Sequence, residues 1–379
     1  TGRDLLGCAV AAAVSASFNA PIAGALFALE VVLRHFAVRA FAPIAIASVA
    51  GTVINRLEFG GVTEFVLPQK GGLAFYVELP AFLLLGLVAG VVAVVLMRSI
   101  FLADDMGNWI QRKTPLPRVL RPAVAGLMLG ALAIYFPHII GVGYETTSRA
   151  LTEGLYFWDA VVFAVIKVIA VAITLAGRMG GGVFSPSLML GALTGLAFGL
   201  IATAVFPAVS GTVGLYALAG MGALAAAVLG APISTALIIF EMTGDWQAGL
   251  AVMVAVSLST ALSWRLVDGS FFLTQIERRG VHLAAGPQAY LKATITAGRL
   301  MRPVEQGAVE AELRALKVRG EKLAGSDTLE TALPMFDRTG ALHLPVVNPE
   351  GEIIGALGHI DALKAFNRAL AETAREEHS

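Results

Sequence analysis

A glycine-rich turn at residues 177–190 is the part of the sequence best suited to hold a small anion. Three glycines at 180–182 lead into a long apolar segment whose helix should start near Val183 or Phe184. The first backbone N–H groups of a helix have no intrahelical acceptor and lie at the partly positive end of its dipole. An anion can be held there without a fixed cation and still be released. We predict an anion site at Gly182, Val183 and Phe184, although a glycine hinge before a span would look similar.

Two glutamates occupy matching places in an internal repeat. The stretch Asn-Ala-Pro-Ile-Ala-Gly-Ala-Leu-Phe-Ala-Leu-Glu ends at Glu30, and Gly-Ala-Pro-Ile-Ser-Thr-Ala-Leu-Ile-Ile-Phe-Glu ends at Glu241. A carboxylate after a mostly apolar run is costly in a bilayer, so it should lie at a helix end or find a partner. We expect Glu241 to cap or pair locally. Transporters commonly use two repeats in inverted orientation, and the sequence leaves that orientation open.

Lys167 and the histidines are the remaining candidates for chemistry. Lys167 stands in the apolar run Val-Ile-Lys-Val-Ile, where snorkelling or pairing with a carboxylate is expected. A membrane-embedded hydrolase needs a nucleophile beside a base. The histidines do not supply one, because His35 and His138 fall at segment ends and the others lie in the C-terminal tail. We therefore expect no enzyme, no metal site and no required cofactor.

Composition indicates a membrane domain followed by a soluble one. The chain has 379 residues, of which 57% are hydrophobic and 14% charged, against about 25% charged in soluble domains. Of the 54 charged residues, 30 lie in 1–280 and 24 in 281–379. The net charge is zero, which argues against a nucleic-acid partner. The single cysteine, Cys8, excludes a disulfide within one chain.

The apolar segments must position these residues. They lie near 5–18, 21–36, 39–54, 79–97, 119–136, 158–177, 183–207, 212–229, 231–243 and 247–267. A straight span needs about 20 residues, so several are too short and must be buried in protein or line a cavity. We predict an all-α polytopic membrane domain with broken helices over 1–280. The basic loop 98–121 favours the cytoplasmic side, as does the C-terminal module.

Four motifs together resemble the CLC family of chloride channels and proton-coupled chloride exchangers. They are Phe-Asn-Ala-Pro at 18–21, Gly-Val-Gly-Tyr at 141–144, Gly-Val-Phe-Ser-Pro at 182–186, and Gly-Met-Gly-Ala at 220–223 running on to Glu-Met-Thr at 241–243. The resemblance implies a CLC-like fold with inverted repeats and a homodimer in a lipid bilayer, in a prokaryotic inner membrane. It also implies chloride held by the amides of Val183 and Phe184. The helices that carry Glu30 and Glu241 would form the dimer interface.

Departures from the family pattern narrow the expectation. The first-half anion motifs, one of which carries the gating glutamate, are absent, so we expect sequence upstream of Thr1. The family tyrosine that contacts the central anion maps to Phe272, which has no donor. The second glutamate of proton-coupled members maps to Val31, which favours weak or absent proton coupling. Channel, exchanger and anion selectivity stay open. The alternative function is a non-conducting membrane scaffold with a sensing module.

The C-terminal residues predict a small α/β domain at 293–379 after a linker at 281–292. A helix is expected over 328–336 with Ser326 or Asp327 as cap, strands over 344–347 and 352–357, and a helix from Asp361. This order resembles one CBS domain, a module that often binds adenine nucleotides. Asp361 is the residue that would contact a nucleotide. Because Gly358 replaces the family's hydroxyl residue, we favour a packing or dimerising role over nucleotide binding.

Overall fold

The computed structural model describes residues 2–34, 38–60, 75–114, 117–152, 154–267, 269–278, 291–292, 295–304 and 308–378. The chain divides into two compact units. One comprises Thr1–Phe36 with Ala40–Arg279, and the other comprises Ala37–Arg39 with Gly280–Ser379. His35 and most of the predicted linker at 281–292 lie outside the described residues.

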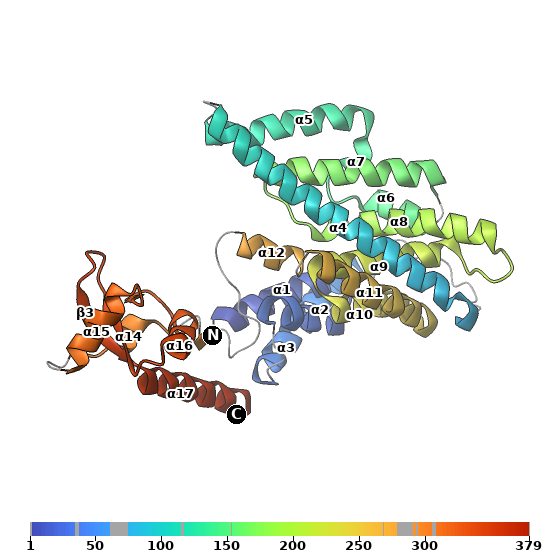
Figure 1. Ribbon diagram of the computed structural model, residues 1–379. Helices are drawn as coiled ribbons and strands as arrows, with labels where there is room; N and C mark the ends of the chain where they lie inside the picture. The colour runs from blue at the N-terminus through green and yellow to red at the C-terminus, as the bar shows by residue number, and fades with distance from the viewer. Residues whose placement is uncertain are drawn as a thin grey trace. The chain divides into compact units, whose positions relative to one another are not determined.

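The first unit is built of helices (Figure 1). They are α1 (Gly2–Phe18), α2 (Pro21–Phe27), the π-helical η1 (Ala28–Leu33), α3 (Val38–Phe59), α4 (Phe75–Lys113), η2 (Arg118–Leu120), α5 (Arg121–Tyr135), η3 (Pro137–Ile139), α6 (Tyr144–Leu151), α7 (Phe157–Ala176), α8 (Phe184–Val205), α9 (Val213–Leu229), α10 (Pro232–Thr243), α11 (Trp246–Val267) and α12 (Phe271–Glu277). Six helices of the described part are long and apolar enough to cross a membrane. Four shorter apolar helices, α1, α2–η1, α9 and α10, confirm the predicted short segments.

Helix α9 is the centre of this unit, because every residue from Val213 to Leu229 is buried. The Thr212 side chain accepts from the Leu215 N–H at its start, and Gly230 ends it in the left-handed conformation. Small residues let α8 cross it closely. A Cβ added at Gly220 would lie 2.6 Å from the Gly191 carbonyl oxygen. Close backbone approach of this kind is how helices pack without a hydrophobic driving force in lipid.

The two repeat helices run antiparallel, as an inverted repeat requires. Glu30, at the end of the first repeat, accepts from the backbone N–H groups of Ile233 at 3.0 Å and Ser234 at 2.8 Å. Glu241, at the end of the second, accepts from Ile22 at 3.1 Å and Ala23 at 2.8 Å. The expectation that Glu241 caps or pairs locally is therefore wrong. Its partners lie more than 200 residues away because the fold places each carboxylate at the start of the other repeat's helix.

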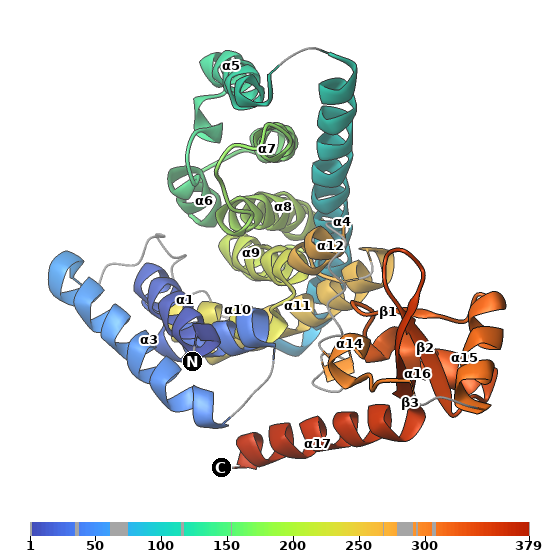
Figure 2. The same ribbon diagram turned by 90° about the vertical axis from the view of Figure 1, so that its left-hand side faces the viewer.

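The second unit holds a three-stranded sheet of order β1-β2-β3, whose strands are labelled in Figure 2. Strand β1 (Leu323–Ala324) runs parallel to β2 (His343–Val347), and β3 (Ile353–Gly358) is antiparallel to β2. The helices are α14 (Ala297–Leu300), α15 (Ala308–Val318), α16 (Leu329–Thr339) and α17 (His359–His378). Their buried core includes Phe336, Leu344 and Leu357.

The strands and helices of this unit confirm the predicted order, but the predicted cap of α16 is wrong. The residue at the N-cap is Thr328, and it makes no side-chain capping bond. The Asp327 carboxylate instead accepts from the Ala324 N–H at 2.7 Å, closing the turn after β1. A short-range turn competes with the cap because both need the same aspartate oxygen.

Candidate anion site

Helix α8 begins where the sequence predicts, with Val183 as N-cap and Phe184 as its first residue. The first intrahelical bond of this turn runs from the Ser187 N–H to the Val183 carbonyl at 3.0 Å. The N–H groups of Val183, Phe184 and Ser185 precede it and have no acceptor within the helix. Pro186 has no N–H and a fixed φ that suits the first turn, so it costs the helix no bond. These N–H groups are the donors that the predicted anion site requires.

The start of α8 opens into a cavity of about 580 Å³. One wall is the glycine run at 180–182 with Phe184, Ser185 and Pro186. The facing walls come from α5, α7 and the loop 139–142. Most of this lining is apolar, so the charges and dipoles that reach the cavity act in a medium of low polarity. The glycines are exposed and bring no side chain between the backbone and the cavity.

Lys167 supplies a positive charge to the same cavity. Its side chain is buried, with 3% of the residue exposed, and its Nζ donates to the carbonyls of Ile139 at 3.1 Å and Gly141 at 3.2 Å. Both expectations for Lys167, snorkelling and pairing with a carboxylate, are wrong. Carbonyl partners carry no net charge, so the ammonium makes the electrostatic potential in the cavity more positive and more favourable for an anion.

The Gly-Val-Gly-Tyr motif explains how those carbonyls reach Lys167. Gly141 and Gly143 have φ values of +68° and +83°, a conformation that favours glycine. A Cβ at Gly143 would also lie 2.4 Å from the Met189 sulfur in α8. The loop can therefore turn tightly against α8 only with glycine at this position.

The ring of Phe184 connects the candidate anion site to the first repeat. Its centroid lies 5.3 Å from that of Phe18 and 5.5 Å from that of Phe27. Phe18 begins the Phe-Asn-Ala-Pro motif, and Phe27 lies on α2. Two motifs recognised separately in the sequence thus form one aromatic cluster, a contact between residues more than 150 positions apart that periodicity does not reveal.

Val31 and Phe272 do not line this cavity. Val31 lies in η1 and Phe272 in α12, and both are partly buried against the main core. The neighbouring Phe271 is the buried ring of the pair and stacks on Phe101 at 5.4 Å. The roles assigned to Val31 and Phe272 remain predictions.

A buried carboxylate was missed by the sequence reading. Glu78 is 2% exposed, and its Oε1 accepts from the Tyr216 hydroxyl at 3.2 Å and from the Gly211 N–H. Its Oε2 has no partner among the described residues. The signal was a glutamate in the apolar run Tyr-Val-Glu-Leu-Pro. Among the residues that the structure describes, no cluster of His, Cys, Asp and Glu is suited to a metal ion.

His138 lies in the short turn η3 between two spanning helices. Its ring stacks on Phe163 with centroids 3.6 Å apart. Burial lowers the pKa of His138, and the charge of Lys167 lowers it further. The lowered pKa favours the neutral imidazole beside the buried Lys167 ammonium.

Known proteins share this architecture. A family model described as voltage gated chloride channel matches residues 1–264. A putative chloride channel protein ClcB-like of Ralstonia nicotianae is 35% identical over 67% of this chain and 58% of its own length. Chloride channel protein CLC-f of Arabidopsis thaliana is 32% identical over 67% of this chain and 35% of its own length. An H(+)/Cl(-) exchange transporter ClcA of Vibrio cholerae is 31% identical over 74% of this chain and 60% of its own length. The chain thus spans less than two thirds of each of these relatives.

Solved structures agree in fold. A slow cyanobacterial Cl-/H+ antiporter superposes with a TM-score of 0.66 at 22% identity, over 73% of this chain and 64% of the antiporter chain. A eukaryotic CLC transporter covers 94% of this chain and 70% of its own, with a TM-score of 0.62 at 20% identity. The apolar helices and the family match together make this an integral membrane protein. Because the voltage gated chloride channel model matches residues 1–264, more than half of its length, the chain belongs to the CLC family of voltage gated chloride channels.

Proposed function

We propose that this protein carries chloride or a similar small anion across a membrane, with the anion held by the backbone amides of Val183 and Phe184. The observation that supports this most is the start of α8, where N–H groups without an acceptor in the helix belong to residues at or next to the cavity. Phe184 and Ser185 line that cavity together with the buried Lys167, and Val183 adjoins them as the buried N-cap. A helix dipole and one ammonium match a single negative charge, while backbone donors impose little geometry on a spherical ion. Gly182 leaves the approach to these amides open.

The same proposal includes weak or absent proton coupling. Relatives carry names of both kinds, a putative chloride channel and H(+)/Cl(-) exchange transporters, so the names do not decide. The hypothesis rests on Val31, because an isopropyl group follows Glu30 where proton-coupled members carry a second glutamate. A side chain without a titratable group cannot accept and release a proton.

Liposome transport tests both parts. The full-length protein would be reconstituted, and chloride release and proton uptake would be followed together under an outward chloride gradient. We expect chloride release with little proton movement. This release should stop when no counter-ion pathway is present to dissipate the membrane potential that it builds. Robust proton uptake driven by the chloride gradient would contradict the hypothesis that proton coupling is weak or absent. Absence of any chloride release would contradict anion transport.

We further propose a homodimer in a prokaryotic inner membrane, with the second unit in the cytoplasm. The repeat helices support the dimer, because Ile22 and Ile233 at their starts are 62% and 53% exposed. The basic end of α4 supports the orientation, since Lys and Arg accumulate on the cytoplasmic side. The helices that carry Glu30 and Glu241 would then face the partner subunit.

The second unit is proposed to be CBS-like, with a packing or dimerising role. The fold match to a eukaryotic CLC transporter, which covers nearly the whole chain, supports the resemblance. The Asp361 carboxylate accepts from Arg302 at 2.7 Å, and a Cβ at Gly358 would lie 3.1 Å from it. The carboxylate is thus engaged within the unit. Calorimetric titration with ATP should show no heat of binding, and saturable binding lost in Asp361→Asn would contradict this role.

A further inference from the structure

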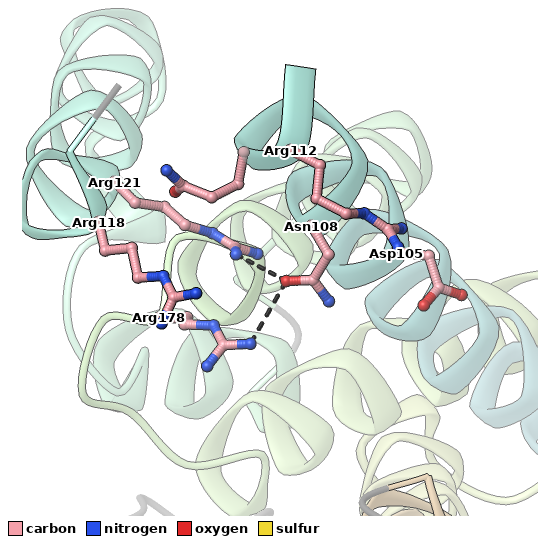
Figure 3. Close-up of a pocket in the computed structure, with 7 residues that line it drawn as sticks. Asp105, Asn108, Arg112, Arg118, Arg121 and Arg178 are labelled. Atoms are coloured by element: carbon pink, nitrogen blue, oxygen red, sulfur yellow. Dashed lines mark hydrogen bonds between the residues drawn. The ribbon is translucent and has the colours of Figure 1, made fainter. Parts of the chain in front are cut away.

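A second, strongly basic cavity lies at the C-terminal end of α4, apart from the residues of the anion site. It has a volume of about 510 Å³ (Figure 3). Its lining residues come from α4, from the start of α5 with the preceding turn, and from the residues just after α7. They are Asp105, Asn108, Gln111, Arg112, Arg118, Arg121 and Arg178. Four guanidinium groups therefore meet one carboxylate in this cavity.

Arg121 has a structural role in this cavity, because its guanidinium is already bonded to neighbouring residues. It is largely buried and donates to Asp104 at 3.2 Å, to the Asn108 side-chain oxygen at 2.7 Å and to the Ala176 carbonyl at 2.6 Å. Gly107 makes room for it, since a Cβ there would lie 2.4 Å from its Nη2. One guanidinium thus joins α4, the start of α5 and the end of α7.

Within the described part of the chain, three positive charges of this cavity have no acidic partner. Among the described residues, the Arg178 side chain donates only to the oxygen of the neutral Asn108 amide, at 3.3 Å. Figure 3 shows Arg121 and Arg178 both directed at that oxygen. Arg112 and Arg118 form no ion pair with any acidic side chain of the described residues. Asp105, the carboxylate of the cavity, pairs with Arg278. Like charges gathered at one site repel, so an anion with several oxygens would stabilise this arrangement.

The position of the cavity along α4 points to the source of that anion. Helix α4 has 39 residues and is about 58 Å long, against a hydrocarbon core of about 30 Å, so its end reaches beyond the core even when tilted. Trp109 is 52% exposed on this end, and the Lys113 ammonium lies 4.3 Å from its ring centroid. Exposed tryptophan beside a basic residue is typical of the membrane–water interface. The cavity therefore lies at the depth of lipid headgroups.

We propose that this arginine cavity binds the phosphate group of an anionic phospholipid. Arginine forks match phosphate oxygens in pairs, whereas a monatomic chloride gains nothing from their planar geometry. Basic pockets between membrane helices at the cytoplasmic surface suit anionic headgroups. Since the cavity joins α4, α5 and α7, the bound lipid would hold the end of α4 against α5 and α7, the two helices that also wall the cavity at the start of α8.

Native mass spectrometry of the full-length protein in detergent tests the proposal. Phosphatidylglycerol and phosphatidylcholine would be added to wild type, to Arg118→Gln, to Arg112→Gln with Arg118→Gln, and to Lys113→Gln. We expect each cavity arginine to contribute about fivefold to phosphatidylglycerol affinity. Lys113→Gln is the matched control, because it removes a charge from the same helix end without lining the cavity. Phosphatidylcholine should bind more weakly and equally to all.

Three results would overturn the proposal. The first is phosphatidylglycerol binding by the double variant as tight as by wild type. The second is an equal loss in Lys113→Gln, which would mean a diffuse charge effect without a site. The third is displacement of the lipid by millimolar inorganic phosphate, which would identify a soluble phosphate as the ligand. Unchanged thermal unfolding of the variants checks their fold. Replacing Arg112 and Arg118 should not affect it, because neither side chain has an ion pair with an acidic residue in the described part of the chain.

Discussion

The carboxylate of Glu241 lies 2.8 Å from the backbone nitrogen of Ala23, at the start of the helix that belongs to the other repeat. Glu30 makes the same contact with Ser234 in return. Pro21 and Pro232 start these helices, so the exposed donors of both first turns are satisfied by the opposite repeat. The two glutamates, each at the end of a mostly apolar run, therefore join the two repeats by hydrogen bonds in both directions.

Replacing Glu241 should lower the free energy of unfolding by an amount that depends on the substituted residue. Glu241→Gln keeps an acceptor oxygen and loses the charge, whereas Glu241→Ala leaves two backbone donors without a partner. We expect a loss of about 1 kcal/mol for Gln and about 2 kcal/mol for Ala, from the usual strength of bonds to charged groups and of helix caps. Thermal unfolding in detergent measures both. Glu58→Gln, on an exposed position of α3, is the control and should have no effect.

The amides at the start of α8 can be tested one at a time. Ser185→Pro removes the N–H of a residue that lines the cavity, and proline is tolerated in a first turn. Ser185→Ala keeps the N–H and removes only the hydroxyl. We expect Ser185→Pro to slow chloride flux in liposomes about tenfold, the effect of losing one hydrogen bond to a charge. Equal flux in both variants would mean that the amide does not contact the permeating ion.

Close packing of α8 on α9 makes a glycine there irreplaceable. Gly220→Ala would place a Cβ 2.6 Å from the Gly191 carbonyl oxygen, so the helices must separate. We expect a loss of about 2 kcal/mol or more in unfolding free energy, as for an overpacked core. Gly130→Ala is the matched control, since a Cβ there meets nothing within 4 Å. It should be neutral or stabilising, because alanine favours helix.

His138 should make stability depend on pH. Burial, with the charge of Lys167, lowers the pKa of His138, so the unfolded chain binds more protons than the folded one below about pH 6.5. Stability from this group is complete above that pH and is lost as pH falls through the lowered pKa. Unfolding temperature should therefore drop between about pH 7.5 and about pH 5. His138→Gln should flatten the part of this slope due to the imidazole, and an unchanged slope would refute the assignment.

The proposed dimer can be probed at the exposed starts of the repeat helices. Ile22→Trp with Ile233→Trp places two large rings on the surface suggested for the partner. We expect a folded monomer by light scattering in detergent, because oversized side chains at a packed interface cost more than they gain. Crosslinking between two copies that persists in the double variant would count against this interface. Ile46→Trp, on an exposed face of α3, is the control.

Much of this protein could be predicted from the sequence because the signals are local. Apolar run length separated the membrane unit from the charged C-terminal unit, and Pro and Gly marked where short helices begin. The start of α8 at Val183 and Phe184 followed from the glycine run, since glycine and proline act within one turn of chain. The two strands on either side of Asn348 followed in the same way from the turn residues Asn-Pro-Glu-Gly at 348–351 between them.

What the tertiary structure decided are the partners of charged groups. Nothing near Glu241, Lys167 or Glu78 in the chain shows that they meet a distant helix start, two loop carbonyls and a buried tyrosine. Such pairings arise when the fold removes each charge from water, so that the nearest donor or acceptor in space becomes its partner. Local sequence determines where a helix begins and ends, but only the packed chain determines what lies opposite.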